Sequence, residues 1–130
     1  MAAIGISACA KKTEPTLHLL AHSMGNSSLS DLRSAGDQLS FHEQLTRNGQ
    51  SYGTDDGGCI ADTDTTANCA LTLSLPGGTI VLQGRVRVAS DTTMLHVSQG
   101  TGKYVETSGV AEAHQSAGNE RQLTLHLKPY

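Results

Sequence analysis

The sequence predicts an all-β protein in which eight antiparallel strands close into one small barrel. From Thr16 onward, apolar and polar residues alternate with a period of two far more often than with the 3.6-residue period of a helix. Short turns rich in Gly, Asn and Pro separate the alternating segments. Eight strands in meander order can close on themselves, which removes the exposed edges of an open sheet. An eight-stranded Greek-key sandwich is the alternative, because strand number alone does not separate the two.

The first half of the chain is expected to supply a strand over residues 16–22, a loop and then a long hairpin. The loop is polar, with one helical turn over 28–34 capped by Ser28. Residues 38–47 alternate cleanly, and Asn48-Gly49 is a strong signal for a tight hairpin. The returning strand covers 50–62. Its Asp-Asp-Gly-Gly passage predicts a bulge or sharp bend, and Asp55-Asp56, Asp62 and Asp64 are assigned to turns.

The second half is expected to add five more strands joined by short turns. They cover residues 69–75, 79–88, 94–99, 106–114 and 121–127. The turns lie at Pro76-Gly77-Gly78, at 100–104 and at Gly118-Asn119. Residues 16–130 are therefore expected to form a single β-barrel domain, preceded by a flexible start over 1–15.

Size and charge exclude several classes of function. The chain has 130 residues, room for one domain, and a formal net charge of −3, so no positive field would attract nucleic acid. No apolar run approaches the ~20 residues of a membrane-spanning helix. With three Tyr, one Phe and no Trp, the core must consist mainly of Leu, Val, Ile and Ala.

The amino terminus and the cysteines suggest export. Ile6-Ser7-Ala8-Cys9 has the form of a lipobox, which predicts the remnant of a lipoprotein signal and a candidate lipid anchor at Cys9; a chance Ala-Cys pair is the alternative. If the intervening turn centres on Asp64, Cys59 lies opposite Cys69, close enough for a disulfide. Such a bridge fits an extracellular or surface-anchored protein. Two free thiols in the cytoplasm are the alternative, and zinc is disfavoured because the Cys spacing matches no usual ligand set.

Several segments taken together resemble the allene oxide cyclase and dirigent superfamily of β-barrels, and most of all its short exported bacterial members. The segments carrying the resemblance are Gly36-Asp37 before Gln38-Leu39-Ser40-Phe41, Tyr52-Gly53-Thr54, Gly57-Gly58-Cys59, Leu75-Pro76-Gly77-Gly78-Thr79-Ile80 with Gln83-Gly84, and Gly100-Thr101-Gly102-Lys103-Tyr104 with Gly109.

The resemblance implies an eight-stranded barrel that holds a hydrophobic ligand and shapes its cyclisation or coupling without a cofactor, as a dimer or trimer. In the cyclase branch, the position of Glu43 is an Asn that helps hold a water, and the position of Cys59 is also Cys, near the substrate. Val86 stands where plant cyclases have Tyr. The coupling branch relies on paired acidic residues in its pocket, and only Asp37 matches one of them.

Glu43 is the candidate catalytic residue. It shares a strand face with Leu39, Phe41 and Leu45, so an inward-facing face would bury its carboxyl group and raise its pKa toward the range of a general acid or base. The alternative places Glu43 at the barrel rim, against water or an Arg. The candidate substrate-binding residues are Phe41, Cys59, Leu71, Leu73, Leu82, Tyr52 and Tyr104, with Val97 and Leu125 as further cavity walls.

The remaining polar residues favour surface roles. Tyr52 and Tyr104 either donate hydrogen bonds into the cavity or pack across glycine turns. His42, Arg85 and Arg87 are expected on the outer face, and the six His, scattered along the chain, match no metal spacing.

Two functions follow from this pattern. The first is an enzyme that binds a hydrophobic small molecule and promotes its cyclisation or isomerisation mainly by positioning it. The second is a non-catalytic exported barrel with a ligand-binding or structural role.

Overall fold

The computed structural model describes residues 16–23, 31–117 and 120–128. The candidate anchor Cys9 and the turn expected at Gly118-Asn119 lie outside these residues, and the helical turn expected over 28–34 begins outside them.

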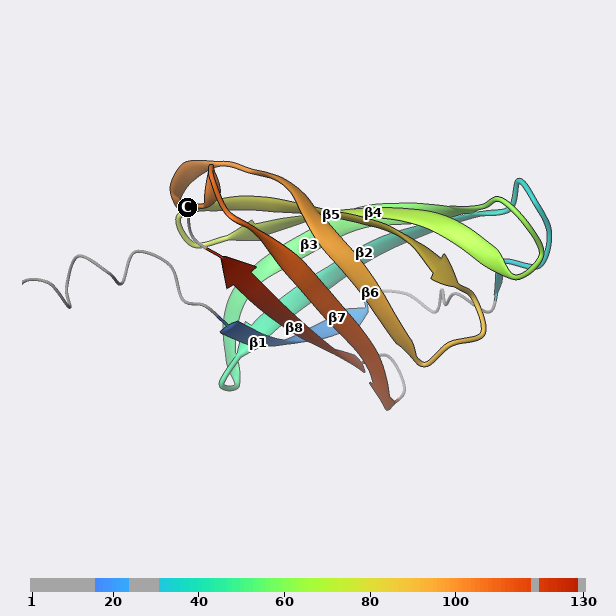
Figure 1. The fold of residues 1–130 in the computed structure, drawn as a ribbon. Coiled ribbons are helices and arrows are strands. Elements are labelled where there is room, and N and C mark those ends of the chain that lie inside the picture. Colours follow the sequence, from blue (N-terminus) through green and yellow to red (C-terminus); the bar gives the residue numbers. More distant parts are fainter. Residues whose placement is uncertain (1–15, 24–30, 118–119, 129–130) are drawn as a thin grey trace, which may run out of the picture.

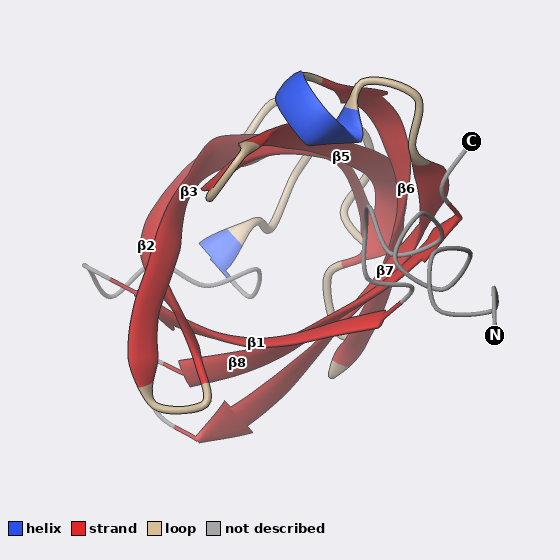
Figure 2. Cartoon of the chain, turned by 90° about the vertical axis from the view of Figure 1, so that its left-hand side faces the viewer, coloured by secondary structure: helices blue, strands red, loops and turns tan. Residues whose placement is uncertain are grey.

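Eight antiparallel strands form a closed barrel in sequence order, each paired with its neighbours in the chain (Figure 1; Figure 2). The strands are β1 (Thr16–Ser23), β2 (Gln38–Arg47), β3 (Gln50–Ala61), β4 (Thr66–Leu75), β5 (Gly78–Arg87), β6 (Thr92–Gly100), β7 (Ser108–Ala117) and β8 (Glu120–Lys128). The barrel closes where β1 pairs with β8, from Thr16 opposite His126 to His22 opposite Glu120. The predicted fold class is confirmed, and the sandwich alternative is wrong.

Alternation along each strand fills the interior with aliphatic side chains. On β4, for example, Ala67, Cys69, Leu71, Leu73 and Leu75 point inward and are buried, while the residues between them are exposed. Because the side-chain period of a strand is two, one face of every strand contributes to a single core. This core is rich in Leu and contains one Phe and one Tyr, as the composition predicts.

The hairpin between β2 and β3 carries the largest departure from the sequence-based prediction. Asn48 and Gly49 have the positive φ angles of a two-residue hairpin turn, as expected. The register shift, however, falls between Leu45 and Thr46, where Tyr52 is the extra residue on β3. The expected bulge at Asp-Asp-Gly-Gly is therefore misplaced.

The Asp-Asp-Gly-Gly passage runs as regular strand, so Asp55 and Asp56 belong to β3 and the prediction of a turn there is wrong. Gly57 is required in this strand because the backbone of β4 approaches it closely. A Cβ on Gly57 would lie 2.1 Å from the carbonyl oxygen of Ala70 on β4, so the residue permits a close approach of the two strands.

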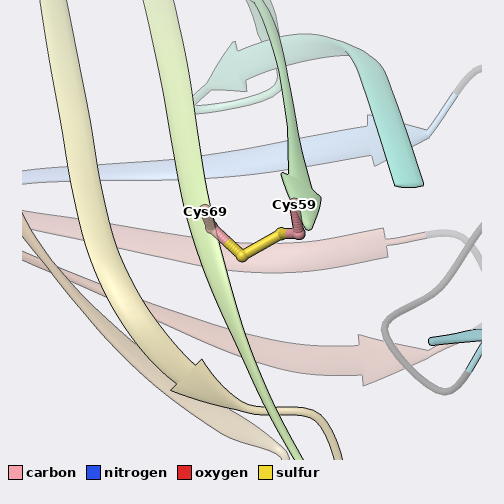
Figure 3. Close-up of a disulfide and its surroundings, with 2 residues drawn as sticks. All are labelled: Cys59 and Cys69. Atoms are coloured by element: carbon pink, nitrogen blue, oxygen red, sulfur yellow. A yellow bond between two sulfur atoms is a disulfide. The ribbon is translucent and has the colours of Figure 1, made fainter. Parts of the chain in front are cut away.

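The predicted disulfide is present. Cys59 on β3 lies directly opposite Cys69 on β4, with a Cα–Cα distance of 4.0 Å, and the bond spans the two strands on their inner face (Figure 3). The bridge therefore locks the register on which the interior of this half of the barrel depends.

A short 3-10 helix, η2 (Gly102–Tyr104), follows β6 and packs on β5. Its Tyr104 is 1% exposed. Within the described ranges, no helix has the length and apolar character needed to cross a membrane.

Replacing both bridging cysteines, Cys59→Ser with Cys69→Ser, should lower the free energy of unfolding by about 2–3 kcal/mol, because the bond closes a short loop in the unfolded chain. Urea unfolding with and without reductant measures this. Reductant should bring the wild type down to the stability of the double variant and leave the variant unchanged. Equal stability of the oxidised wild type and the variant would contradict it.

Candidate functional site

Two carboxyl groups face each other inside the barrel. Glu43 on β2 is the direct register partner of Asp55 on β3. Both side chains point inward, and the residues are 2% and 1% exposed. Among the described residues they are the only buried charged or polar ones. A carboxylate is costly to bury without a partner, so this pair must be neutralised by a cation or by a proton.

Arg121 supplies the cation. It lies near the start of β8, and its guanidinium forms an ion pair with Glu43. Its register partner on β1 is Ala21, which in turn faces Leu45 on β2, so β1 places only a small side chain between Arg121 and β2. The guanidinium also lies over the ring of Phe41, 4.7 Å from the ring centroid, a cation–π contact. The Arg121 side chain is 19% exposed, whereas that of Glu43 is 3% exposed.

Asp55 is neutralised by a proton. Burial, followed by the hydrogen bond and the negative charge of Glu43, raises the pKa of Asp55 from its ordinary value of 3.8 to about 8, and Arg121 opposes this shift only in part. Asp55 is therefore a neutral carboxylic acid at pH 7. Its Oδ1 atom is buried and has no hydrogen-bond partner among the residues that the structure describes, which is uncommon for a buried oxygen.

This arrangement provides a proton donor at neutral pH. The Glu43 carboxylate is bound by Arg121, and the Asp55 carboxyl group keeps its proton because it is buried and lies against the hydrogen bond and charge of Glu43. A carboxylic acid with a raised pKa in an apolar site is suited to general acid catalysis and to hydrogen bonding with a ligand oxygen.

The structure brings some of the predicted substrate-binding residues to this pair. Phe41, Gly57 and Leu71 form one cross-strand row directly beside Glu43 and Asp55. Phe41 and Leu71 each keep 8% exposure, and Gly57 contributes no side chain between them. Leu82 continues the same row, and Leu73 is the partner of Asp55 on β4, but both have no exposure.

Other predicted residues lie apart from the pair. Cys59 is in the disulfide. Tyr52 is the bulge residue beside the hairpin, where Arg47 lies over its ring at 5.4 Å. Tyr104 is buried in η2 beyond the end of β6. Val97 extends the row of Phe41, and Leu125 packs in the core with no exposure.

Asp37, the residue matched to the paired acids of the coupling branch, lies in the turn before β2 and apart from the Glu43–Asp55 pair. Its carboxylate is exposed and accepts hydrogen bonds from the backbone N–H groups of Arg33 and Ser34, at 2.9 and 3.1 Å. These bonds lower the pKa of Asp37 and give it a role in the turn before β2. His42 lies on the outer face and pairs with Asp56, and Arg85 pairs there with Asp62 at 2.9 Å, as their alternation predicts.

No group of three or more His, Cys, Asp and Glu side chains that could hold a metal ion occurs in the described part of the chain. A cavity of about 700 Å³ is present, but it opens on the outer surface across β2 to β6. Of the predicted substrate-binding residues, only Cys59 borders it, so it is not the expected cavity around Glu43.

Comparison with known proteins identifies the family. The model of the allene oxide cyclase barrel-like domain matches residues 19–125. No curated protein matches the chain. Among solved structures, pyocyanin demethylase superposes with a TM-score of 0.73 at 22% identity, covering 87% of this chain and 99% of that one.

Two further structures show the same fold. The pterocarpan synthase dirigent protein GePTS1 has a TM-score of 0.72 at 17% identity and covers 88% of this chain and 87% of its own. The Diels-Alderase AbmU from Streptomyces koyangensis has a TM-score of 0.66 at 16% identity, with coverage of 97% and 75%. The protein is thus a small closed β-barrel with a buried acidic pair, and it belongs to the allene oxide cyclase barrel-like family.

The raised pKa of Asp55 predicts a specific dependence of stability on pH. Between pH 4 and about 8 the folded protein holds a proton on Asp55 that the unfolded chain has lost, so the free energy of unfolding should fall as pH rises through this range. Asp55 lowers the free energy of unfolding by at most about 1.4 kcal/mol per pH unit. This decrease stops once the pH exceeds the pKa of Asp55 in the folded protein. The side chain at position 55 stays neutral in the variant Asp55→Asn, so the variant should lack this decrease in stability with pH.

Urea unfolding of both proteins at several pH values from 5 to 9 measures the difference. The stability of Asp55→Asn relative to the wild type should increase steadily up to about pH 8. The exposed Asp64→Asn is the control and should keep the wild-type slope. A constant difference between Asp55→Asn and the wild type at every pH would show that Asp55 is ionised in the folded protein.

Proposed function

We propose that this protein binds an apolar small molecule inside its barrel and promotes its cyclisation or isomerisation, with Asp55 as the acid. The observation that carries the proposal is the protonated carboxyl group of Asp55, buried next to the Glu43–Arg121 ion pair, with one oxygen that has no partner in the described part of the chain. A structural role alone would be better served by an apolar residue, because a half-satisfied polar cluster destabilises a core.

The proposed chemistry needs one proton and no co-reactant. Asp55 donates a hydrogen bond, or its proton, to an oxygen of the ligand such as the carbonyl of a conjugated enone. Electron density then shifts toward that oxygen as the new carbon–carbon bond of the ring forms at the expense of the double bonds that react. When the product forms, the proton returns to Asp55. Glu43, held by Arg121, faces Asp55 throughout and orients its proton.

Apolar walls would supply the rest of the rate enhancement. Phe41 and Leu71 lie on either side of Gly57, in the cross-strand row next to Asp55. A folded ligand held between these two side chains loses the freedom that otherwise slows ring closure. Arg121 covers this position from the solvent side, so ligand entry requires its guanidinium to move off the Phe41 ring. We therefore assign Arg121 a positioning role.

The neighbouring structures support a small-molecule function. One is a Diels-Alderase, another is a pterocarpan synthase dirigent protein and a third is pyocyanin demethylase. Their identity to this chain is too low to transfer a substrate, and fold alone does not determine function. The disulfide supports our further proposal that the protein acts after export, because such bonds persist in oxidising compartments.

A second candidate function is a non-catalytic exported barrel that binds a ligand or serves a structural role. It is favoured by the complete burial of Leu45, Leu73, Ile80 and Leu82, which fill one part of the interior. In that case the acidic pair would anchor a ligand or fix the register of β2 and β3 without turnover.

Mass spectrometry of small molecules that co-purify with the protein should first identify the ligand. Turnover of its linear, unsaturated carbonyl precursors is then compared in the wild type and in Asp55→Asn. Loss of the acid should lower kcat by about 100-fold or more. In the wild type, kcat should fall as pH rises through about 8, because the protonated form is the active one.

The adjacent Asp56→Asn is the matched control, since Asp56 points outward on the same strand. It should retain wild-type turnover. If Asp55→Asn forms product as fast as the wild type, Asp55 is not the acid. If the wild type binds the precursor without converting it, the non-catalytic function is correct.

A further inference from the structure

A second site lies on the outer surface, separate from the acidic pair. The groove of about 700 Å³ crosses β2 to β6. These strands are side by side in the sheet (Figure 1). Its volume falls within the range of about 300–1,000 Å³ typical of small-molecule sites. Most of its lining residues lie on the outer face of the barrel, although Leu39, Gly57, Cys59, Cys69 and Gly84 belong to the inner face. The lining includes neither Glu43 nor Asp55, so the groove does not depend on the function proposed above.

The register explains the hollow. Ser40, Gly58, Ala70, Gln83 and His96 are successive partners in one outward-facing row across five strands. Gly58 and Ala70, the two smallest residues, occupy the middle of this row. The larger Gln83 and His96 occupy its end on β5 and β6. Small residues between larger ones leave a trough whose floor is close to the backbone. The neighbouring row, with Ile60 and Asn68, forms the adjacent wall.

Apart from Arg85, the polar side chains that line the groove are uncharged. Three primary amides line it, those of Gln38, Asn68 and Gln83, together with the Ser40 hydroxyl and the His96 imidazole. Each of these groups can both donate and accept hydrogen bonds. None of the five side chains is hydrogen-bonded to another group of the described protein.

The charges around the groove are already matched. No carboxylate is among its lining residues, and its one guanidinium, that of Arg85, donates to Asp62 and to Thr66 at 2.9 and 3.2 Å. The groove also lacks Phe, Tyr and Trp. It therefore offers neither an anion site nor a stacking surface for a nucleobase.

We propose that this groove binds a neutral, hydroxyl-rich saccharide. Sugar hydroxyls are both donors and acceptors, which matches the three amides, the hydroxyl and the imidazole. The apolar face of a sugar ring fits the exposed side chain of Ile60 and the floor at Ala70. Because the groove has no aromatic platform, we expect weak binding of one short chain.

Titration of ¹⁵N-labelled protein with maltotriose, cellotriose and triacetylchitotriose, followed by two-dimensional NMR, tests the proposal. At least one trisaccharide should shift amide signals confined to the groove strands around Ser40, Gly58, Asn68, Gln83 and His96. Ala70→Phe fills the floor from an exposed strand position and should weaken binding at least tenfold. Ser74→Phe is the matched control, outward-facing on the same strand but outside the groove, and should bind normally.

Further variants separate this site from the interior one. Asn68→Ala and Gln83→Ala should each weaken saccharide binding several-fold, whereas Asp55→Asn should leave it unchanged. The proposal is overturned if none of the three saccharides shifts these signals, or if Ala70→Phe binds as the wild type does. It is also overturned if sedimentation shows that the wild type self-associates and Ala70→Phe alone is monomeric, since the groove is then a protein interface.

Discussion

The placement of two carboxyl groups opposite each other in a closed barrel is the constraint on which this structure depends. Glu43 and Asp55 share one guanidinium, so the interior can hold only one of them as a carboxylate without a large cost. Desolvation and the neighbouring charge keep the proton on Asp55. The result is an acid that is neutral at physiological pH and lies beside apolar walls, and the proposed chemistry follows from this protonation state.

A single extra residue creates the juxtaposition. Next to the two-residue turn, Thr46 pairs with Ser51. If this register continued along the hairpin without a bulge, Thr54 would lie opposite Glu43. The bulge at Tyr52 shifts β3 by one residue, so Asp55 turns inward instead. The disulfide maintains the same register further along the strand, because Asp55, Gly57 and Cys59 share the inner face.

The sequence predicts the strands, the inner face of β2 with Glu43, and the disulfide, since each depends on local alternation or on a short turn. It does not predict Asp55 as a site residue, because the position of the bulge decides which face that side chain occupies. Side chains on a strand alternate between its two faces, so counting back from Cys59 in steps of two places Asp55 on the same face. This is the signal that could have found Asp55. Arg121 was missed for a different reason. It reaches Glu43 across 78 residues only because β8 closes the barrel against β1.

The protonation state of Asp55 is the central claim and is directly measurable. In protein labelled with ¹³C at the aspartate carboxyl carbons, the signal assigned to Asp55 by its loss in Asp55→Asn is followed from pH 3 to pH 10. We expect its chemical shift to titrate with a midpoint of about 8. A midpoint near the ordinary value of 3.8 would contradict the account, because Asp55 would then be ionised at neutral pH and could not act as the acid.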